Sequence, residues 1–140
     1  MIKPRTLARR LALQYCFACD LNDRWDLEGW LPFLDDCDAA SDSEGIKDKA
    51  IPYARELVEK VLAGREGFDA SIAACTRNWK LERLAAVERN ILRIAAAELA
   101  DGHLDKRIVI SEAVWLAQNF GSKDSGKFVN GVLDAMAAQV

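Results

Sequence analysis

Histidine is almost absent from this sequence, which contains only His103. One imidazole cannot build a histidine-based metal cluster, and no serine or cysteine nucleophile pattern has a histidine base. A glycine-rich phosphate loop is missing too, because Gly121, Gly126 and Gly131 are spaced five apart and no strand precedes them. Adjacent acids occur only in polar stretches, without an apolar pocket to perturb them. We therefore expect a protein that is not an enzyme and holds no metal or cofactor.

Cysteine is present but forms no disulfide framework. Cys16 and Cys19 have the C-x-x-C spacing, yet they lie inside a helical pattern with no second pair and no nearby histidine. We interpret them as small buried thiols in a reducing compartment, with a zinc or redox site as the alternative.

Long hydrophobic runs are also lacking, since none approaches the roughly 20 residues that span a bilayer. The basic first ten residues are not followed by the uninterrupted apolar stretch of a secretory signal. We expect a cytoplasmic protein that does not enter a membrane. Its 140 residues, 51% hydrophobic and with only 3 prolines, are typical of one globular domain over residues 1–140, or of two small bundles that share a core.

The net charge of −3 is unevenly spread. Residues 1–10 carry Lys3, Arg5, Arg9 and Arg10 without an acid, whereas residues 20–49 are strongly acidic. A basic tip on an acidic chain is typical of a protein that touches a polyanion on one face only. We interpret residues 37–45, which are small, polar and acidic, as an exposed loop.

Apolar residues recur at helical spacing along most of the chain, and no segment alternates as a strand does. Residues 107–110 have strand propensity, but a lone strand without a partner is implausible. Pro52 fits a helix only in its first turn, and Gly64 and Gly67 indicate a break. The pattern predicts an all-α fold of about seven helices, at residues 4–21, 26–36, 48–63, 68–77, 81–100, 108–120 and 125–136.

The last predicted helix follows Gly121, which suits a left-handed helix stop, and Ser122, Asp124 or Ser125 can cap it. An apolar stripe of Val129, Val132, Leu133 and Met136 places Lys127 on the opposite, outer face. Phe128 falls at the boundary between core and water, where its ring either fills the core or meets a partner.

Basic residues recur beside an aromatic residue at two places in the chain. Arg9 and Arg10 precede Phe17 in the first helix, and Lys127 precedes Phe128 in the last. Basic side chains bind phosphates while a ring stacks on an unpaired base, which is how single-stranded RNA is gripped. The competing interpretation of Phe17 is structural, because with Leu13 it gives the first helix a second apolar face for packing between neighbours.

Three segments together resemble the NusB family of bacterial transcription antitermination factors. The stretch from Ala8 to Gln14, with Phe17, Asp20 and Leu21, is similar to the family's opening helix, and Asn78 to Leu99 to its long central helix. The segment Lys127-Phe-Val-Asn-Gly-Val-Leu-Asp134 resembles its C-terminal signature. The likeness is collinear over nearly the whole chain, apart from the acidic loop.

The resemblance implies two small helical bundles packed together and a non-enzymatic protein that binds RNA. In that family NusB pairs with NusE, a small-subunit ribosomal protein. The pair binds the boxA element of nascent RNA, and RNA polymerase in the antitermination complex then reads through terminators in ribosomal RNA operons. Some members self-associate, so a homodimer is also allowed. A related domain is fused to ribosomal RNA methyltransferases, but we do not expect that activity here, because these 140 residues show no segment for a methyl-donor domain.

The resemblance also implies which residues contact RNA, and the basic pattern adds Arg10 to them. Two departures from the family stand out. Phe17 replaces the usual tyrosine, which keeps stacking but loses a hydroxyl, and Thr6 and Leu7 interrupt the arginine cluster. A helical protein–protein adaptor without RNA binding is the competing hypothesis, since the net charge is negative. The expected RNA-binding residues are Arg5, Arg9, Arg10, Phe17, Asp124, Ser125, Lys127 and Phe128.

Overall fold

A computed structural model describes residues 2–37, 45–76 and 80–139. Within these ranges the chain is helical and contains no strand, which confirms the predicted all-α fold. Residues 107–110 are helical, as expected. The elements are α1 (Pro4–Asn22), α2 (Trp30–Asp36), α3 (Ile46–Cys75), the short 3-10 helix η1 (Leu81–Arg83), α4 (Ala86–Asp101), α5 (Lys106–Phe120) and α6 (Ser125–Ala137).

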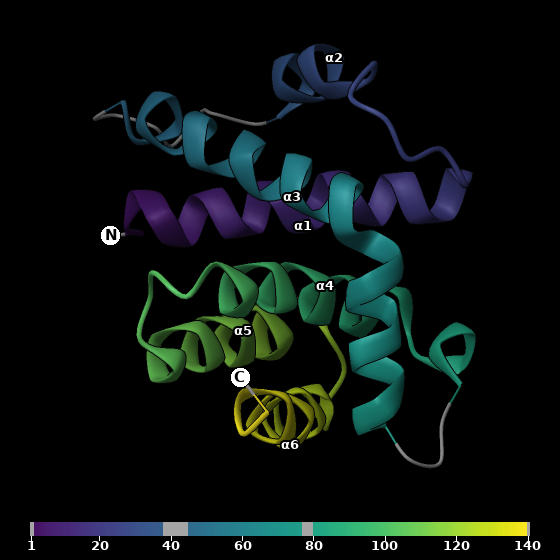
Figure 1. The fold of residues 1–140 in the computed structure, drawn as a ribbon. Coiled ribbons are helices and arrows are strands. Elements are labelled where there is room, and N and C mark those ends of the chain that lie inside the picture. Colours follow the sequence, from purple (N-terminus) through teal and green to yellow (C-terminus); the bar gives the residue numbers. More distant parts are fainter. Residues whose placement is uncertain (1, 38–44, 77–79, 140) are drawn as a thin grey trace.

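The helices form two groups joined by α3. In Figure 1, α1 lies along the first half of α3 with α2 beyond it, whereas α4, α5 and α6 lie together on the other side. The second half of α3 turns and runs past α4 toward α6. The most extensive helix contacts are those of α1 with α3, of α5 with α6 and of α3 with α4. This arrangement agrees with two small bundles that share one core.

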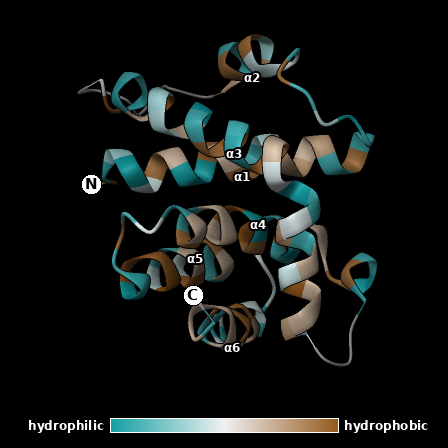
Figure 2. Ribbon diagram, viewed as in Figure 1, coloured by the Kyte–Doolittle hydropathy of each residue, from teal (hydrophilic) through white to brown (hydrophobic). Residues whose placement is uncertain are grey.

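Helix α4 is the centre of the molecule, because it contacts α1, α3, α5 and α6. Every residue from Asn90 to Leu99 is buried, and hydrophobic stretches recur along α4, α5 and α6 where they lie together (Figure 2). Leu92 and Arg93 give this helix a face of mixed character, yet both residues are buried. Helix α1 covers that face, and Arg93 is neutralised by Asp20 at 3.0 Å and Asp69 at 2.7 Å.

The two helices expected at residues 48–63 and 68–77 are one continuous helix, α3. Gly64 does not break it, and the ring of Phe68, one turn later, fills the position where a side chain would stand. Pro52 lies inside the helix rather than in its first turn. It is exposed, so water can satisfy the carbonyl that its missing N–H leaves without a partner.

Most helix ends follow the sequence signals. Pro4 is in the first turn of α1, as predicted, and the Asp105 side chain caps α5 by accepting a hydrogen bond from the Arg107 amide at 2.8 Å. The central helix begins later than expected, because η1 and a short link occupy residues 81–85. The expected acidic loop at residues 37–45 lies mostly outside the described residues, as do residues 77–79.

A buried polar network ties four helices together around Glu98 of α4. The guanidinium of Arg9, from α1, donates to Glu98 at 2.8 and 2.9 Å and to Glu112 of α5 at 2.8 Å. The Tyr53 hydroxyl, from α3, also donates to Glu98. Burial and this bond raise the pKa of Tyr53 to about 12. Arg9 and Glu98 are only 3% exposed, so each charge depends on the other for compensation.

Replacing Arg9 by alanine is expected to lower the free energy of unfolding by about 3 kcal/mol, because Glu98 would remain buried without its cation. The matched control is Arg5→Ala, one turn earlier, which removes an exposed guanidinium stacked 3.9 Å from the centre of the Tyr53 ring. That change should cost no more than about 1 kcal/mol. Urea unfolding followed by circular dichroism measures both, and equal losses would contradict a dominant role for the buried pair.

Candidate nucleic-acid interface

The turn between α5 and α6 carries four of the expected site residues on or next to it, and Gly121 opens it. Its backbone is extended, with φ −96° and ψ −165°, so the expected left-handed stop was wrong. Glycine is needed for space instead: a Cβ would lie 2.7 Å from the Ser125 Cβ and 2.8 Å from the Ala117 carbonyl oxygen. The chain can therefore fold back tightly from α5 into α6.

Ser125 and Asp124 have different roles in this turn. Ser125 is buried, its hydroxyl donates to Glu88 Oε2 at 2.7 Å, and its Oγ accepts from the Ser122 amide at 2.9 Å. Asp124 occupies the N-cap position of α6, but its side chain makes no capping hydrogen bond. Its exposed carboxylate therefore faces solvent at the start of the helix.

The next two residues lie where the helix pattern put them. Lys127 is exposed, opposite the buried stripe of Val129, Val132 and Leu133. Phe128 is half-buried and packs with one side against the core. It is thus the predicted boundary residue, anchored by the core yet partly open to solvent.

A contact between an arginine and a phenylalanine brings α1 to this turn. The Arg10 guanidinium lies 5.6 Å from the centre of the Phe120 ring, and Phe120 immediately precedes Gly121. Arg10 Nε is buried and has no hydrogen-bond partner among the described residues. The cation–π contact with Phe120 thus holds this half-buried guanidinium at the turn.

Phe17 lies two turns after Arg10 on the same side of α1 and is half-buried. One turn further, Asp20 accepts a hydrogen bond from Arg89 of α4 at 2.8 Å. The neighbouring Glu88 binds Ser125 of α6. The first turn of α4 therefore connects the part of α1 that carries Phe17 to the start of α6.

The two remaining expected residues point elsewhere. Arg5 is exposed and stacks on Tyr53, away from the contact between Arg10 and Phe120. Arg9 is buried in the network with Glu98 and Glu112, so its guanidinium is not available to a phosphate in this structure. The structure thus places Asp124, Ser125, Lys127 and Phe128 at the start of α6, while Arg10 contacts Phe120 just before the turn and Phe17 is linked through α4.

Sequence reasoning missed two residues of this region. Phe120 is not among the expected site residues, yet it is 37% exposed and lies beside Arg10. Glu88 is not among them either. No local signal identifies its bond to Ser125, because the two residues are 37 positions apart.

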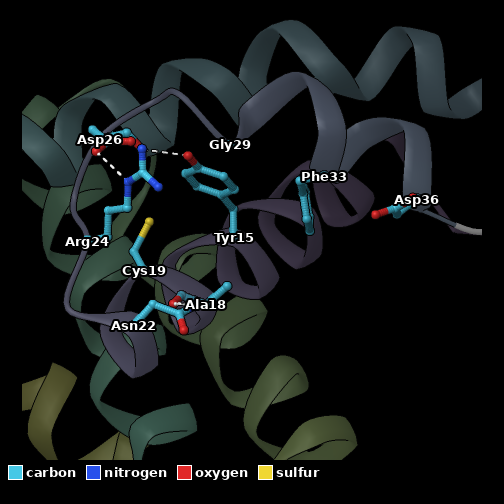
Figure 3. A pocket seen from close by; sticks show the side chains of 9 residues that line it. All are labelled: Tyr15, Ala18, Cys19, Asn22, Arg24, Asp26, Gly29, Phe33 and Asp36. Carbon is cyan, nitrogen blue, oxygen red and sulfur yellow. Dashed lines mark hydrogen bonds and ion pairs between the residues drawn. The ribbon is translucent and has the colours of Figure 1, made fainter.

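A separate hollow lies between α1 and α2 (Figure 3) and is lined by residues such as Tyr15, Cys19 and Phe33. At one end the Tyr15 hydroxyl donates to the Asp26 carbonyl at 2.5 Å, and Arg24 pairs with the Asp26 carboxylate. None of the eight expected RNA-binding residues is among the described residues that line it. Cys16 and Cys19 are both buried, and burial raises the pKa of Cys16 to about 12, which suits an unreactive thiol.

The described helices define a class of small all-α proteins in which two groups of helices pack around one central helix, α4. Comparison with known proteins narrows this class. The family model described as "NusB family" matches residues 6–138. Transcription antitermination protein NusB of Bdellovibrio bacteriovorus is 36% identical over 132 residues, which cover 93% of this chain and 92% of that protein. The Anaeromyxobacter dehalogenans protein of the same name is 37% identical and covers 99% and 93%.

Solved structures give the same answer. T. maritima NusB superposes with a TM-score of 0.79 at 30% identity, covering 99% of this chain and 94% of that one. A protein chain in the crystal structure of a plectonemic RNA supercoil has a TM-score of 0.80 at 31% identity, covering 99% and 96%. The chain therefore belongs to the NusB family of transcription antitermination factors, which is a non-catalytic family. Among its described helices, none has the length and apolarity needed to cross a membrane.

Replacing Gly121 of the turn and Gly131 of α6 by alanine should change the free energy of unfolding in opposite directions. Gly121→Ala should lower the free energy of unfolding by about 1–3 kcal/mol, because its methyl group would overlap Ser125 and a backbone carbonyl. Gly131→Ala should raise it by roughly 0.5–1 kcal/mol, since that position has open space and alanine favours a helix. Thermal unfolding of both variants is the measurement, and a stabilised Gly121→Ala protein would show that the turn is not tightly packed.

Proposed function

We propose that this protein binds single-stranded RNA of the boxA type in nascent ribosomal RNA transcripts, together with NusE, and so takes part in the antitermination complex of RNA polymerase. It would act in the cytoplasm, where bacterial transcription occurs. The observation that carries the proposal is the contact between Arg10 and Phe120. It joins the basic, aromatic face of α1 to the turn that carries Lys127 and Phe128.

In this proposal, electrostatic attraction binds the phosphates of the RNA, and stacking binds its bases. Arg10, Lys123 and Lys127 supply positive charge at α1 and the α5–α6 turn, and such charges neutralise phosphates whatever the base sequence. Phe128 and Phe17 present partly open rings on which unpaired bases stack. The Asp124 carboxylate, which is not used in capping, can accept a hydrogen bond from a base edge.

The buried residues of the expected set fit supporting roles in this proposal. Arg9 holds α1 against α4 and α5, so its effect on RNA would be exerted through the position of α1. Arg5 remains an exposed cation that can contact phosphates beyond the main surface. With a net charge of −3, affinity for RNA should depend strongly on the NusE partner.

The Phe128 ring should contribute about 1–3 kcal/mol to RNA binding through stacking. Phe128→Leu tests this better than alanine, because leucine preserves apolar packing against the core while it removes the aromatic face. Filter-binding titrations with a boxA-type single strand, with and without NusE, should show the loss while the melting temperature changes little. Absence of binding by the wild-type protein, even with NusE, would instead favour the helical adaptor.

Lys127→Ala should weaken RNA binding and lower the slope of log K against log salt by about 1, as expected for one lost phosphate contact. Arg55→Ala is the matched control, since it removes an exposed cation that pairs with Glu59 on α3. Its salt slope should equal that of the wild type. A slope that Lys127→Ala leaves unchanged would place Lys127 outside the phosphate-binding surface.

A further inference from the structure

We propose that Glu88 is a positioning residue for RNA binding, which acts through Ser125 to hold the start of α6. This inference rests on the proposed function. Glu88 lies in the first turn of α4, and its Oε2 atom is 2.7 Å from the Ser125 hydroxyl. It is not one of the residues expected to touch RNA, and it carries the charge that RNA repels.

The hydrogen-bond chemistry leaves one direction for each bond at Ser125. A carboxylate accepts only, so the Ser125 hydroxyl donates its proton to Glu88. A backbone amide donates only, so the same oxygen accepts from Ser122. The Ser125 side chain is thus engaged on both sides and buried, which makes it part of the support of the turn rather than a surface that RNA can reach.

Helix α4 is a suitable reference for this support, because its buried length contacts all the larger helices. The residue next to Glu88, Arg89, binds Asp20 at 2.8 Å and thereby holds α1 near Phe17. One turn of α4 therefore fixes both the helix that carries Phe17 and the helix that carries Phe128. Rings held in place before binding lose less conformational entropy when bases stack on them.

Because Glu88 is negatively charged, the two possible roles predict opposite changes in RNA affinity when it is removed. Removing a carboxylate near a polyanion should strengthen binding if electrostatics alone matter. Removing one that positions Phe128 should weaken it. We expect Glu88→Ala to weaken binding of a boxA-type single strand, measured with NusE present, by about fivefold, the factor that one hydrogen bond contributes. Its salt slope should match that of the wild type, because no phosphate contact is lost.

Three further variants identify the route of the effect. Glu88→Gln keeps an acceptor oxygen and should bind within about twofold of the wild type. Glu82→Ala, which removes an exposed carboxylate from η1, should not weaken binding. In a Phe128→Leu background, Glu88→Ala should cost less than about twofold, since coupled residues are not additive. Melting temperatures confirm that each variant is folded at the temperature of the titration.

The outcomes separate the two proposals. If the wild-type protein binds RNA and Glu88→Ala binds equally well or more tightly, the positioning role is overturned while the proposed function stands. Full additivity of Glu88→Ala with Phe128→Leu would also overturn it, since Glu88 would then act independently of the ring. If the wild-type protein does not bind RNA with NusE, the proposed function fails and this inference fails with it.

Discussion

The buried carboxylate of Glu98 is the constraint on which the arrangement of helices depends. It receives hydrogen bonds from Arg9 of α1 and Tyr53 of α3, and Arg9 continues to Glu112 of α5. A buried charge is tolerated only when its partners are in place, so the network disfavours other registers of α1 against α4 and α5. Once that register is set, the next residue of α1, Arg10, lies against Phe120, at the turn that precedes α6.

Local periodicity was enough to predict the all-α fold, because the apolar residues on the buried face of a helix recur every three or four positions. The stripe beginning at Val129 is an example, and its residues are buried as expected. Structural features that depend on contacts with residues far away in the sequence could not be predicted from this periodicity. The ion pairs of Arg93 with Asp20 and Asp69 are an example, because they compensate the charge of a buried residue that would otherwise indicate an outer face.

The same distinction applies to the candidate site. The outward direction of Lys127 and the boundary position of Phe128 follow from α6 alone, so the sequence was sufficient to predict both. Whether a basic or polar residue is exposed or engaged depends on the rest of the fold. Arg9 is engaged by acids 89 and 103 positions away, and Ser125 by one 37 positions away. Residues that look alike in the sequence therefore differ in whether the fold engages their side chains or leaves them exposed.

A nuclear magnetic resonance titration of the isotope-labelled protein, with unlabelled NusE and a boxA-type single strand, tests the proposed surface most directly. RNA added to the preformed protein pair should shift the amide signals of Asp124, Lys127 and Phe128, and those around Arg10 and Phe17 on α1. Amides around Tyr15 in the hollow between α1 and α2 should change little. Shifts confined to that hollow, or no shifts at saturating RNA, would contradict binding of RNA by the surface that α1 and α6 form.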